Sequence, residues 1–316
     1  MKDFLLRIEE IKHFLPKLSS IFIPLFFLIA FVEITVLNVY TQKKIAQESI
    51  LPAPFTDISY TSYPLIKDKF IPDLSAKAAI AVDDDSKVIL FSKNPEFRFA
   101  PASTTKIMTA LTSLQFFNLR DTLTVRVATS EGSIIGLKKN QKIRFEDLLY
   151  AMMLPSANDA ALAIAQNYPG GENAFLNKMN ENAKRLHLFS THFSDPAGLM
   201  DDKGYTTVLD LARLASAALK NETFAQVVAT KHKVISDSGG QNEYSVNNLN
   251  KLLGFDGVNG IKTGYTDEAG QVLVTSKIEK GHTIIIVVMK SADRFGDTQK
   301  LLQLVSNNIT YLSTHP

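Results

Sequence analysis

The stretch Gln271–Lys290, QVLVTSKIEKGHTIIIVVMK, has two runs of β-branched and apolar residues on either side of Glu279-Lys280-Gly281. Runs of this composition, joined by a short polar turn that contains glycine, are typical of a β-hairpin. The predicted strands are Val272–Lys277 and Thr283–Met289. This hairpin is the starting point for the fold.

A second hairpin is predicted far upstream. Lys77–Ser92, KAAIAVDDDSKVILFS, has strand-like runs at Ala78–Val82 and Lys87–Phe91 around an Asp-rich turn. The pattern between the two hairpins is mostly helical, and a closing helix is expected from about Asp297 because apolar residues gather on one side of it: Leu301, Leu302, Leu304, Val305 and Ile309. We therefore predict an α/β (α+β) fold, in which the first and last hairpins meet in one antiparallel sheet that the terminal helix backs.

The composition of the 316-residue chain excludes several classes of protein. A hydrophobic fraction of 45% with 21% charged residues argues against disorder. The formal net charge of +2, without a basic run carrying aromatics, argues against nucleic-acid binding. The chain has no cysteine, which excludes disulfides, Cys-ligated zinc and a Cys nucleophile. The six histidines show no metal-ligand spacing, so no metal or cofactor is predicted.

The apolar segment Ile21–Tyr40, IFIPLFFLIAFVEITVLNVY, is long enough to match the ~30 Å hydrocarbon core of a bilayer. A cleaved signal peptide would have a shorter apolar core and a small-x-small site, which the following VLNVYTQKK does not offer. A buried core helix would need partner elements nearby. We therefore predict an uncleaved anchor, and the basic residues that precede it favour a cytoplasmic N-terminus. Glu33 is the residue that fits a membrane span least.

The predicted organisation follows from this anchor. Residues 1–20 form a short cytoplasmic segment, 21–40 the transmembrane helix and 41–74 a linker punctuated by Pro52, Pro54, Pro64 and Pro72. Residues 75–316 form the globular domain, which this arrangement places outside the cytoplasm at the cell membrane.

The stretch Phe99–Ala110, FAPASTTKIMTA, has two interpretations. Ser103 caps a helix and Lys106 is solvated, or the two side chains react together, since i, i+3 spacing puts them on one helix face. A serine hydroxyl is a weak nucleophile unless a base takes its proton. A lysine can be that base only when it is neutral, with a pKa well below ~10.4, and burial or a second cation can bring this about.

Two further motifs favour the reactive interpretation. Ser156-Ala157-Asn158 follows Pro155 at the start of an alanine-rich helix, where simple capping is the alternative. Lys262-Thr263-Gly264 precedes the last hairpin, where an ordinary turn with a solvated lysine is the alternative. All three motifs occur in this order, each at an element boundary, which chance explains poorly.

The three motifs together resemble the Ser-x-x-Lys, Ser-x-Asn and Lys-Thr-Gly signature of penicillin-binding proteins and β-lactamases. The surrounding sequence is similar to the D-alanyl-D-alanine carboxypeptidases of low molecular mass, from about residue 75 to the C-terminus. The similar segments are PASTTKIMTAL, MMLPSANDAA, FSDPAGL (Phe193–Leu199), YTTVLDLARLA (Tyr205–Ala215), NLNKLLG (Asn248–Gly254) and GIKTGYTDEAG. The resemblance implies the penicillin-binding/β-lactamase-like transpeptidase fold, an antiparallel sheet flanked by helices plus an all-helical subdomain.

The resemblance also implies a reaction. Ser103 would attack the carbonyl between the last two D-alanines of a peptidoglycan stem peptide, form an acyl-enzyme and release D-alanine. Lys106 would be the base for that attack, and Ser156 would relay a proton to the leaving amine. β-Lactam antibiotics would acylate Ser103 as covalent inhibitors.

Five more residues would bind the substrate on the same analogy. Asn158 would hydrogen-bond the substrate amide and help to fix Lys106. Lys262, with Thr263, would bind the terminal carboxylate, and its charge would help to keep Lys106 neutral. Gly264 would let the strand approach the substrate. The N–H groups of Ser103 and Tyr265 would form the oxyanion hole.

Two alternatives remain at this point. A class A-like β-lactamase would need a Glu-x-x-Leu-Asn motif, and ENAFLN (Glu172–Asn177) has one residue too many. A catalytically silent wall-binding protein would have no reason to keep Ser103, Lys106 and Lys262 together. Ala157 departs from the Gly or Asp common at its position, but it is small.

Overall fold

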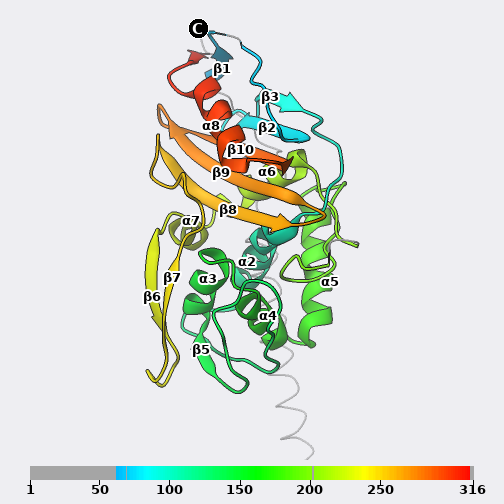
Figure 1. Ribbon diagram of the computed structural model, residues 1–316, viewed down its shortest axis with the longest axis vertical. Helices are drawn as coiled ribbons and strands as arrows, with labels where there is room; N and C mark the ends of the chain where they lie inside the picture. The colour runs from blue at the N-terminus through cyan, green and yellow to red at the C-terminus, as the bar shows by residue number, and fades with distance from the viewer. Residues whose placement is uncertain (1–61, 69, 201–202, 314–316) are drawn as a thin grey trace, which may run out of the picture. The chain divides into compact units, whose positions relative to one another are not determined.

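The computed structural model describes residues 62–68, 70–200 and 203–313 (Figure 1). Its centre is a five-stranded antiparallel sheet in the order β3-β2-β10-β9-β8. The strands are β3 (Ile89–Lys93), β2 (Ala78–Asp83), β10 (His282–Ser291), β9 (Gly270–Glu279) and β8 (Val258–Thr266). Both predicted hairpins are confirmed, and they meet as expected, since β2 pairs with β10.

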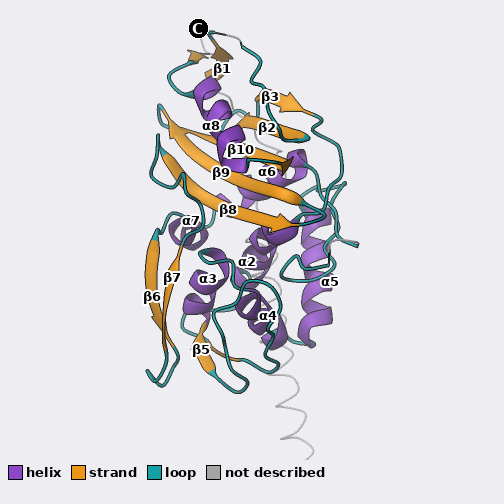
Figure 2. Ribbon diagram, in the orientation of Figure 1, coloured by secondary structure: helices purple, strands orange, loops and turns teal. Residues whose placement is uncertain are grey.

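The central strands are buried on both faces, which explains their continuous apolar sequences. Every residue of β2 is buried, and β10 is buried from Ile284 to Met289. Helix α8 (Arg294–Val305) covers one face of the sheet and α6 (Val208–Leu219) covers the other (Figure 2). The leucines of α8 pack with apolar residues of β2, β9 and β10 in one core cluster.

The end of the chain differs from the sequence prediction in two details. Helix α8 begins at Arg294, because the carboxylate of Asp293 accepts a hydrogen bond from the backbone N–H of Gly296 and caps it. The helix ends at Val305, so Ile309 lies in a further strand, β11 (Ile309–Ser313). The backbone turns extended at Ser306, and the segment pairs as a strand instead of continuing the helix.

Strand β11 pairs antiparallel with β1 (Ser62–Ile66), a segment that the sequence assigned to the linker of residues 41–74. Leu74 and Ala76 are also buried, in the core beneath α8. The buried carboxylate of Asp297 on α8 accepts hydrogen bonds from the backbone N–H groups of Ser75 and Ala76. Residues 62–66 therefore belong to the folded unit, while 41–61 lie outside the described residues.

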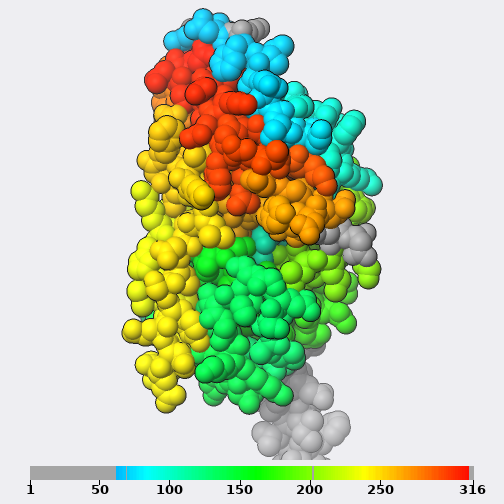
Figure 3. Space-filling view, in the orientation of Figure 1, coloured from blue at the N-terminus to red at the C-terminus, as the bar shows by residue number. Residues whose placement is uncertain are grey.

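The second half of the unit is mainly helical. It contains α2 (Lys106–Leu114), α3 (Phe145–Met153), α4 (Asn158–Asn167), α5 (Gly171–Arg185) and α7 (Glu222–Val228). Two small hairpins accompany these helices: β4 (Thr122–Thr124) with β5 (Lys142–Arg144), and β6 (His232–Ser236) with β7 (Glu243–Asn247). In the space-filling view the green surface of the helical half meets the orange strands of the sheet directly (Figure 3).

The predicted cytoplasmic segment 1–20 and anchor 21–40 lie outside the described residues. Among the helices of the described ranges, none has the length and apolar character that crossing a bilayer requires.

Candidate active site

The residues predicted for the site come together where the edge strand β8 meets the helical half. A cavity of about 250 Å³ there is lined by six of the eight: Ser103, Ser156, Asn158, Thr263, Gly264 and Tyr265. The other two, Lys106 and Lys262, are buried at 0% and 2% exposure. Three motifs that are distant in the sequence therefore form one site.

Ser103 and Lys106 lie at the beginning of a helix, but neither side chain caps it. Ser103 belongs to the 3-10 turn η1 (Ala102–Thr105), and Lys106 is the first residue of α2. No side-chain capping bond forms at the start of η1 or of α2. Instead, Lys106 Nζ lies 2.9 Å from Ser103 Oγ. The interpretation with a solvated lysine is wrong, because Lys106 is fully buried.

Lys106 Nζ has two further partners, both of them oxygen acceptors. It donates to Asn158 Oδ1 at 2.7 Å and to the backbone carbonyl of Ala197 at 2.7 Å. Burial lowers the pKa of Lys106 to about 7, against the weaker opposing effects of Asp195 and Asp159. A lysine with this pKa exists partly as the neutral amine at physiological pH.

The two carboxylates that act on Lys106 are occupied elsewhere. Asp195 accepts hydrogen bonds from the backbone N–H groups of four residues in the turn that follows it: Ala197, Gly198, Leu199 and Met200. Asp159 accepts from the backbone of a second loop, at Ile135, Gly136 and Leu137. Each carboxylate thus holds a loop beside the cavity, and neither forms an ion pair with Lys106 among the described residues.

The turn after Asp195 fits closely against η1. A Cβ on Gly198 would lie 1.9 Å from the carbonyl oxygen of Ala102, and Gly198 has a φ of +76°. Only glycine can therefore occupy this position without displacing η1. This contact also brings the carbonyl of Ala197 to the Lys106 amine.

Ser156 is held in an unusual position before α4. Its φ is +67°, in the left-handed region that non-glycine residues rarely adopt. Its side chain is 5% exposed, and its buried Oγ has no hydrogen-bond partner among the described residues. An unpaired buried hydroxyl is unfavourable unless something binds there, and this one lines the cavity.

Asn158, the first residue of α4, connects the lysine to the loop above the cavity. While Oδ1 accepts from Lys106, Nδ2 donates to the carbonyl of Glu131 at 2.9 Å. The backbone N–H of Asn158 donates to the carbonyl of Ser133 at 2.7 Å. These bonds position Gly132 and Ser133, which line the cavity. No motif in the sequence indicates that this loop belongs to the site.

The Lys-Thr-Gly motif lies within strand β8, whereas the sequence predicts only that it precedes the last hairpin. Lys262 Nζ donates to the carbonyl of Thr263 at 3.1 Å. Burial lowers the pKa of Lys262 well below its usual value, and the positive charges of Lys106 and Arg294 add to this effect. A Cβ on Gly264 would lie 3.2 Å from the Ser103 backbone nitrogen, so β8 runs against η1.

Arg294 is another residue of the site that sequence reasoning missed. It lines the cavity, and its Nη1 donates to the carbonyl of Gly264 at 2.8 Å. It begins α8, 30 residues after that glycine, and no local pattern marks it. Asp195, by contrast, was present in the FSDPAGL segment that carried the resemblance, although no role had been attached to it.

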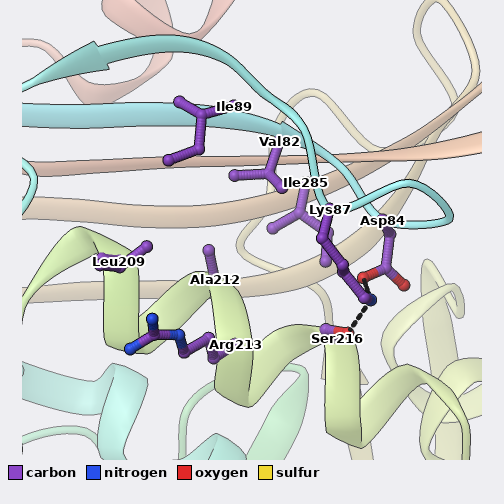
Figure 4. Close-up of a pocket in the computed structure, with 9 residues that line it drawn as sticks. All are labelled: Val82, Asp84, Lys87, Ile89, Leu209, Ala212, Arg213, Ser216 and Ile285. Carbon is purple, nitrogen blue, oxygen red and sulfur yellow. Dashed lines mark hydrogen bonds and ion pairs between the residues drawn. The ribbon is translucent and has the colours of Figure 1, made fainter. Parts of the chain in front are cut away.

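A second cavity, of about 230 Å³, lies between α6 and the sheet (Figure 4). Apolar side chains of β2, β3 and β10 form one wall, and α6 forms the other. Its polar groups bond one another, since Lys87 Nζ donates to Ser216 Oγ at 2.7 Å. The three motifs contribute nothing to its lining.

The comparison with protein families agrees with this geometry. The family model described as D-alanyl-D-alanine carboxypeptidase matches residues 66–293. A D-alanyl-D-alanine carboxypeptidase of Streptomyces sp. (strain K15) is 34% identical over 254 residues, 73% of this chain and 87% of that protein. D-alanyl-D-alanine carboxypeptidase DacF of Bacillus subtilis (strain 168) is 32% identical over 252 residues, and the match spans 76% of this chain and 64% of that protein.

Solved structures show the same similarity in three dimensions. The crystal structure of the Streptomyces K15 DD-transpeptidase superposes with a TM-score of 0.71 at 32% sequence identity. The superposition covers 75% of this chain and 98% of that one. The penicillin-binding fold predicted from the sequence is confirmed by this similarity and by the mixed architecture of the structure.

Proposed function

This chain belongs to the D-alanyl-D-alanine carboxypeptidase family of serine peptidases, and we propose that it removes the terminal D-alanine from peptidoglycan stem peptides through an acyl-enzyme on Ser103. One observation carries the proposal. The buried amine of Lys106, whose pKa is lowered to about 7, lies 2.9 Å from the Ser103 hydroxyl. A serine nucleophile and a base in the protonation state that it needs are thus adjacent.

The three contacts of Lys106 suit a neutral amine. Such an amine has two hydrogens and one lone pair. Asn158 Oδ1 and the carbonyl of Ala197 can only accept, so they take the two hydrogens. The lone pair is left for the third contact, Ser103, whose hydroxyl can donate. Attack by Ser103 Oγ on the peptide carbonyl then moves its proton to Lys106.

The tetrahedral intermediate needs donors for its oxyanion and a proton for its leaving group. We assign the first role to the backbone N–H groups of Ser103 and Tyr265, since β8 and η1 are in contact at Gly264. We assign the second to Ser156, whose unpaired Oγ lines the cavity and can carry the proton from Lys106 to the departing D-alanine nitrogen. Water then attacks the ester, with Lys106 again as base.

The terminal carboxylate of the substrate fits the cationic side of the cavity. Thr263 and Arg294 line the cavity, and the buried Lys262 donates to the carbonyl of Thr263. Asn158 hydrogen-bonds the substrate amide in this scheme. An anionic substrate end would restore the charge of Lys262, whose pKa is lowered by burial.

The β-lactamase alternative is not favoured. No carboxylate side chain is among the described residues that line the cavity, so the glutamate base that a class A-like β-lactamase uses for fast hydrolysis of a penicilloyl ester is missing there. β-Lactams are therefore proposed as slowly released inhibitors on Ser103. We retain the anchor at 21–40 as part of this proposal, with 1–20 in the cytoplasm, a linker after the anchor and the catalytic unit outside the cell membrane.

The test is mass spectrometry of the intact protein after exposure to penicillin, together with an assay for D-alanine release from a peptide ending in D-Ala-D-Ala. We expect a long-lived adduct on Ser103 and free D-alanine. Rapid loss of the adduct would support a β-lactamase, and the absence of any adduct would support a silent wall-binding protein. A product joined to an added amine acceptor would indicate transfer instead of hydrolysis.

A further inference from the structure

A second group of reactive side chains lies at the end of the sheet, away from the cavity. It consists of Asp83, the last residue of β2; Asp85, in the turn that follows; and His282, the first residue of β10. One potential ligand atom from each of the three lies within 4.8 Å of the others. Asp83 is fully buried, Asp85 is exposed and His282 is partly buried.

The contacts of His282 within this cluster are not hydrogen bonds. Its Nδ1 lies 3.0 Å from Asp85 Oδ2 and 3.8 Å from Asp83 Oδ2. Yet Nδ1 is a buried atom with no hydrogen-bond partner among the described residues. A nitrogen and two carboxylate oxygens therefore converge at ion-pair distances, an arrangement that either a proton on the imidazole or a shared metal ion would stabilise.

Neighbouring groups hold two of the three side chains in place. Asp83 Oδ1 accepts from the backbone N–H of Ser86 at 2.8 Å and from its hydroxyl at 2.6 Å. Asp83 Oδ2 accepts from the Tyr311 hydroxyl at 2.8 Å. The Tyr311 ring stacks on the imidazole of His282, with centroids 3.6 Å apart and planes 9° from parallel. Partners of this kind orient metal ligands in proteins.

We propose that Asp83, Asp85 and His282 form a Zn²⁺ site with three protein ligands. Imidazole nitrogen with carboxylate oxygens is a ligand set suited to zinc, whereas Ca²⁺ and Mg²⁺ prefer oxygen alone. Ligands about 2.1 Å from a tetrahedral ion lie ~3.4 Å apart. The distances of 3.0 and 3.8 Å bracket that separation, so small side-chain movements complete the geometry.

The zinc ion joins parts of the fold that are distant in the sequence. It links the turn after β2 to the start of β10 and, through Tyr311, to the terminal strand β11. Because β11 pairs with β1, the ion connects a strand from within the predicted linker to the central sheet. With three protein ligands, the fourth position of the ion is left to a water molecule.

The site is separate from the cavity that contains Ser103. His282 and Val288 are six residues apart on β10, about 20 Å along a strand. Val288 pairs with Leu273, and Leu273 pairs with Thr263 of the cavity. The proposal therefore does not depend on the reaction at Ser103. The spacing of histidines in the sequence could not reveal it, since His282 is almost 200 residues from the aspartates.

The test uses the untagged full-length chain, stripped with EDTA and dialysed free of chelator. Calorimetric titration with ZnCl₂ should give one Zn²⁺ per chain, and zinc should raise the thermal midpoint. We expect Asp85→Asn, an exposed change that leaves the core intact, to weaken zinc binding at least tenfold. His282→Phe keeps an aromatic ring against Tyr311 and should abolish binding.

Asp84→Asn is the matched control, because Asp84 is the neighbouring carboxylate in the same turn but bonds Lys87. It should bind zinc as the wild type does. Penicillin labelling of Ser103 should be unchanged in all three variants, which shows that each folds. Three results would overturn the proposal: no zinc bound by the wild type, equal losses in Asp84→Asn and Asp85→Asn, or a thermal midpoint that zinc does not change.

Discussion

The rate at which Ser103 is acylated should rise with pH around neutrality, because only neutral Lys106 can accept the Ser103 proton. The cause is burial, which lowers the pKa of Lys106 from 10.5 to about 7. Protonation of Lys106 removes the base, so the acylation rate falls as the pH falls through the pKa of Lys106 in the folded protein.

The size of the effect follows from the same shift. The decrease of the Lys106 pKa from 10.5 to about 7 means that the protein disfavours the charged form of this lysine by roughly 5 kcal/mol. At pH 7 an ordinary lysine is neutral in about one molecule in 3,000, whereas about half of the Lys106 side chains are neutral. Acylation at pH 7 should therefore be about half its maximum, and at pH 5 about 1% of it.

The assay is the second-order rate of labelling by a fluorescent penicillin, measured from pH 5 to 9. Lys262→Arg is the control, because arginine keeps a cation beside Lys106 but does not titrate in this range. The rise of the labelling rate near pH 7 should persist in this variant if Lys106 is the group that titrates. Three results would refute Lys106 as the base: a labelling rate independent of pH, a rise with its midpoint near pH 10, or no rise near pH 7 in Lys262→Arg.

Four substitutions test other parts of the structure. Asn158→Ala removes the 2.7 Å bond to Lys106, so penicillin labelling should slow by about 10- to 100-fold while the thermal midpoint changes little; unaltered labelling would contradict its positioning role. Gly264→Val should slow labelling more than tenfold, since even its Cβ would crowd the Ser103 nitrogen at 3.2 Å, whereas Gly239→Ala, with nothing nearer than 3.7 Å, should have no effect. Lys262→Ala should reduce D-alanine release from a peptide with a free carboxylate far more than cleavage of its C-terminal amide; equal losses would argue against carboxylate binding. Asp297→Ala leaves the N–H groups of residues 75 and 76 without their acceptor, so urea denaturation should show that the free energy of unfolding falls by about 2–4 kcal/mol. A decrease below about 1 kcal/mol would contradict this role of Asp297.

Much of the fold could be predicted because its signals are local. The apolar runs at Ala78–Val82 and Thr283–Met289 appear as β2 and β10, and each is buried as its composition indicates. The meeting of the two hairpins in one sheet was predicted as well, because strands lie at both ends of the domain with helices between them, but the sequence did not indicate that β2 and β10 are the strands that pair. Strand β11 was missed, because its partner β1 lies more than 240 residues away, in a proline-containing segment that was predicted to be a linker.

The predicted site residues were recognised by their types and spacing, but Arg294 was not. It reaches the cavity only because α8 begins beside the end of β8, which no pattern around residue 294 indicates. The same reason applies to the Asp83, Asp85 and His282 cluster, whose members meet where β2 and β10 pair.

What the sequence determined by itself is chemical identity and local form: a serine three residues before a lysine at a helix start, a Ser-x-Asn before a helix and a Lys-Thr-Gly beside a hairpin. Only the tertiary structure decided the contacts and the protonation states of those groups. Lys106 can be a base because residues 52 and 91 positions away, Asn158 and Ala197, bond its amine in a place that water does not reach. A pKa depends on burial and on neighbours in space, and neither is defined until the chain has folded.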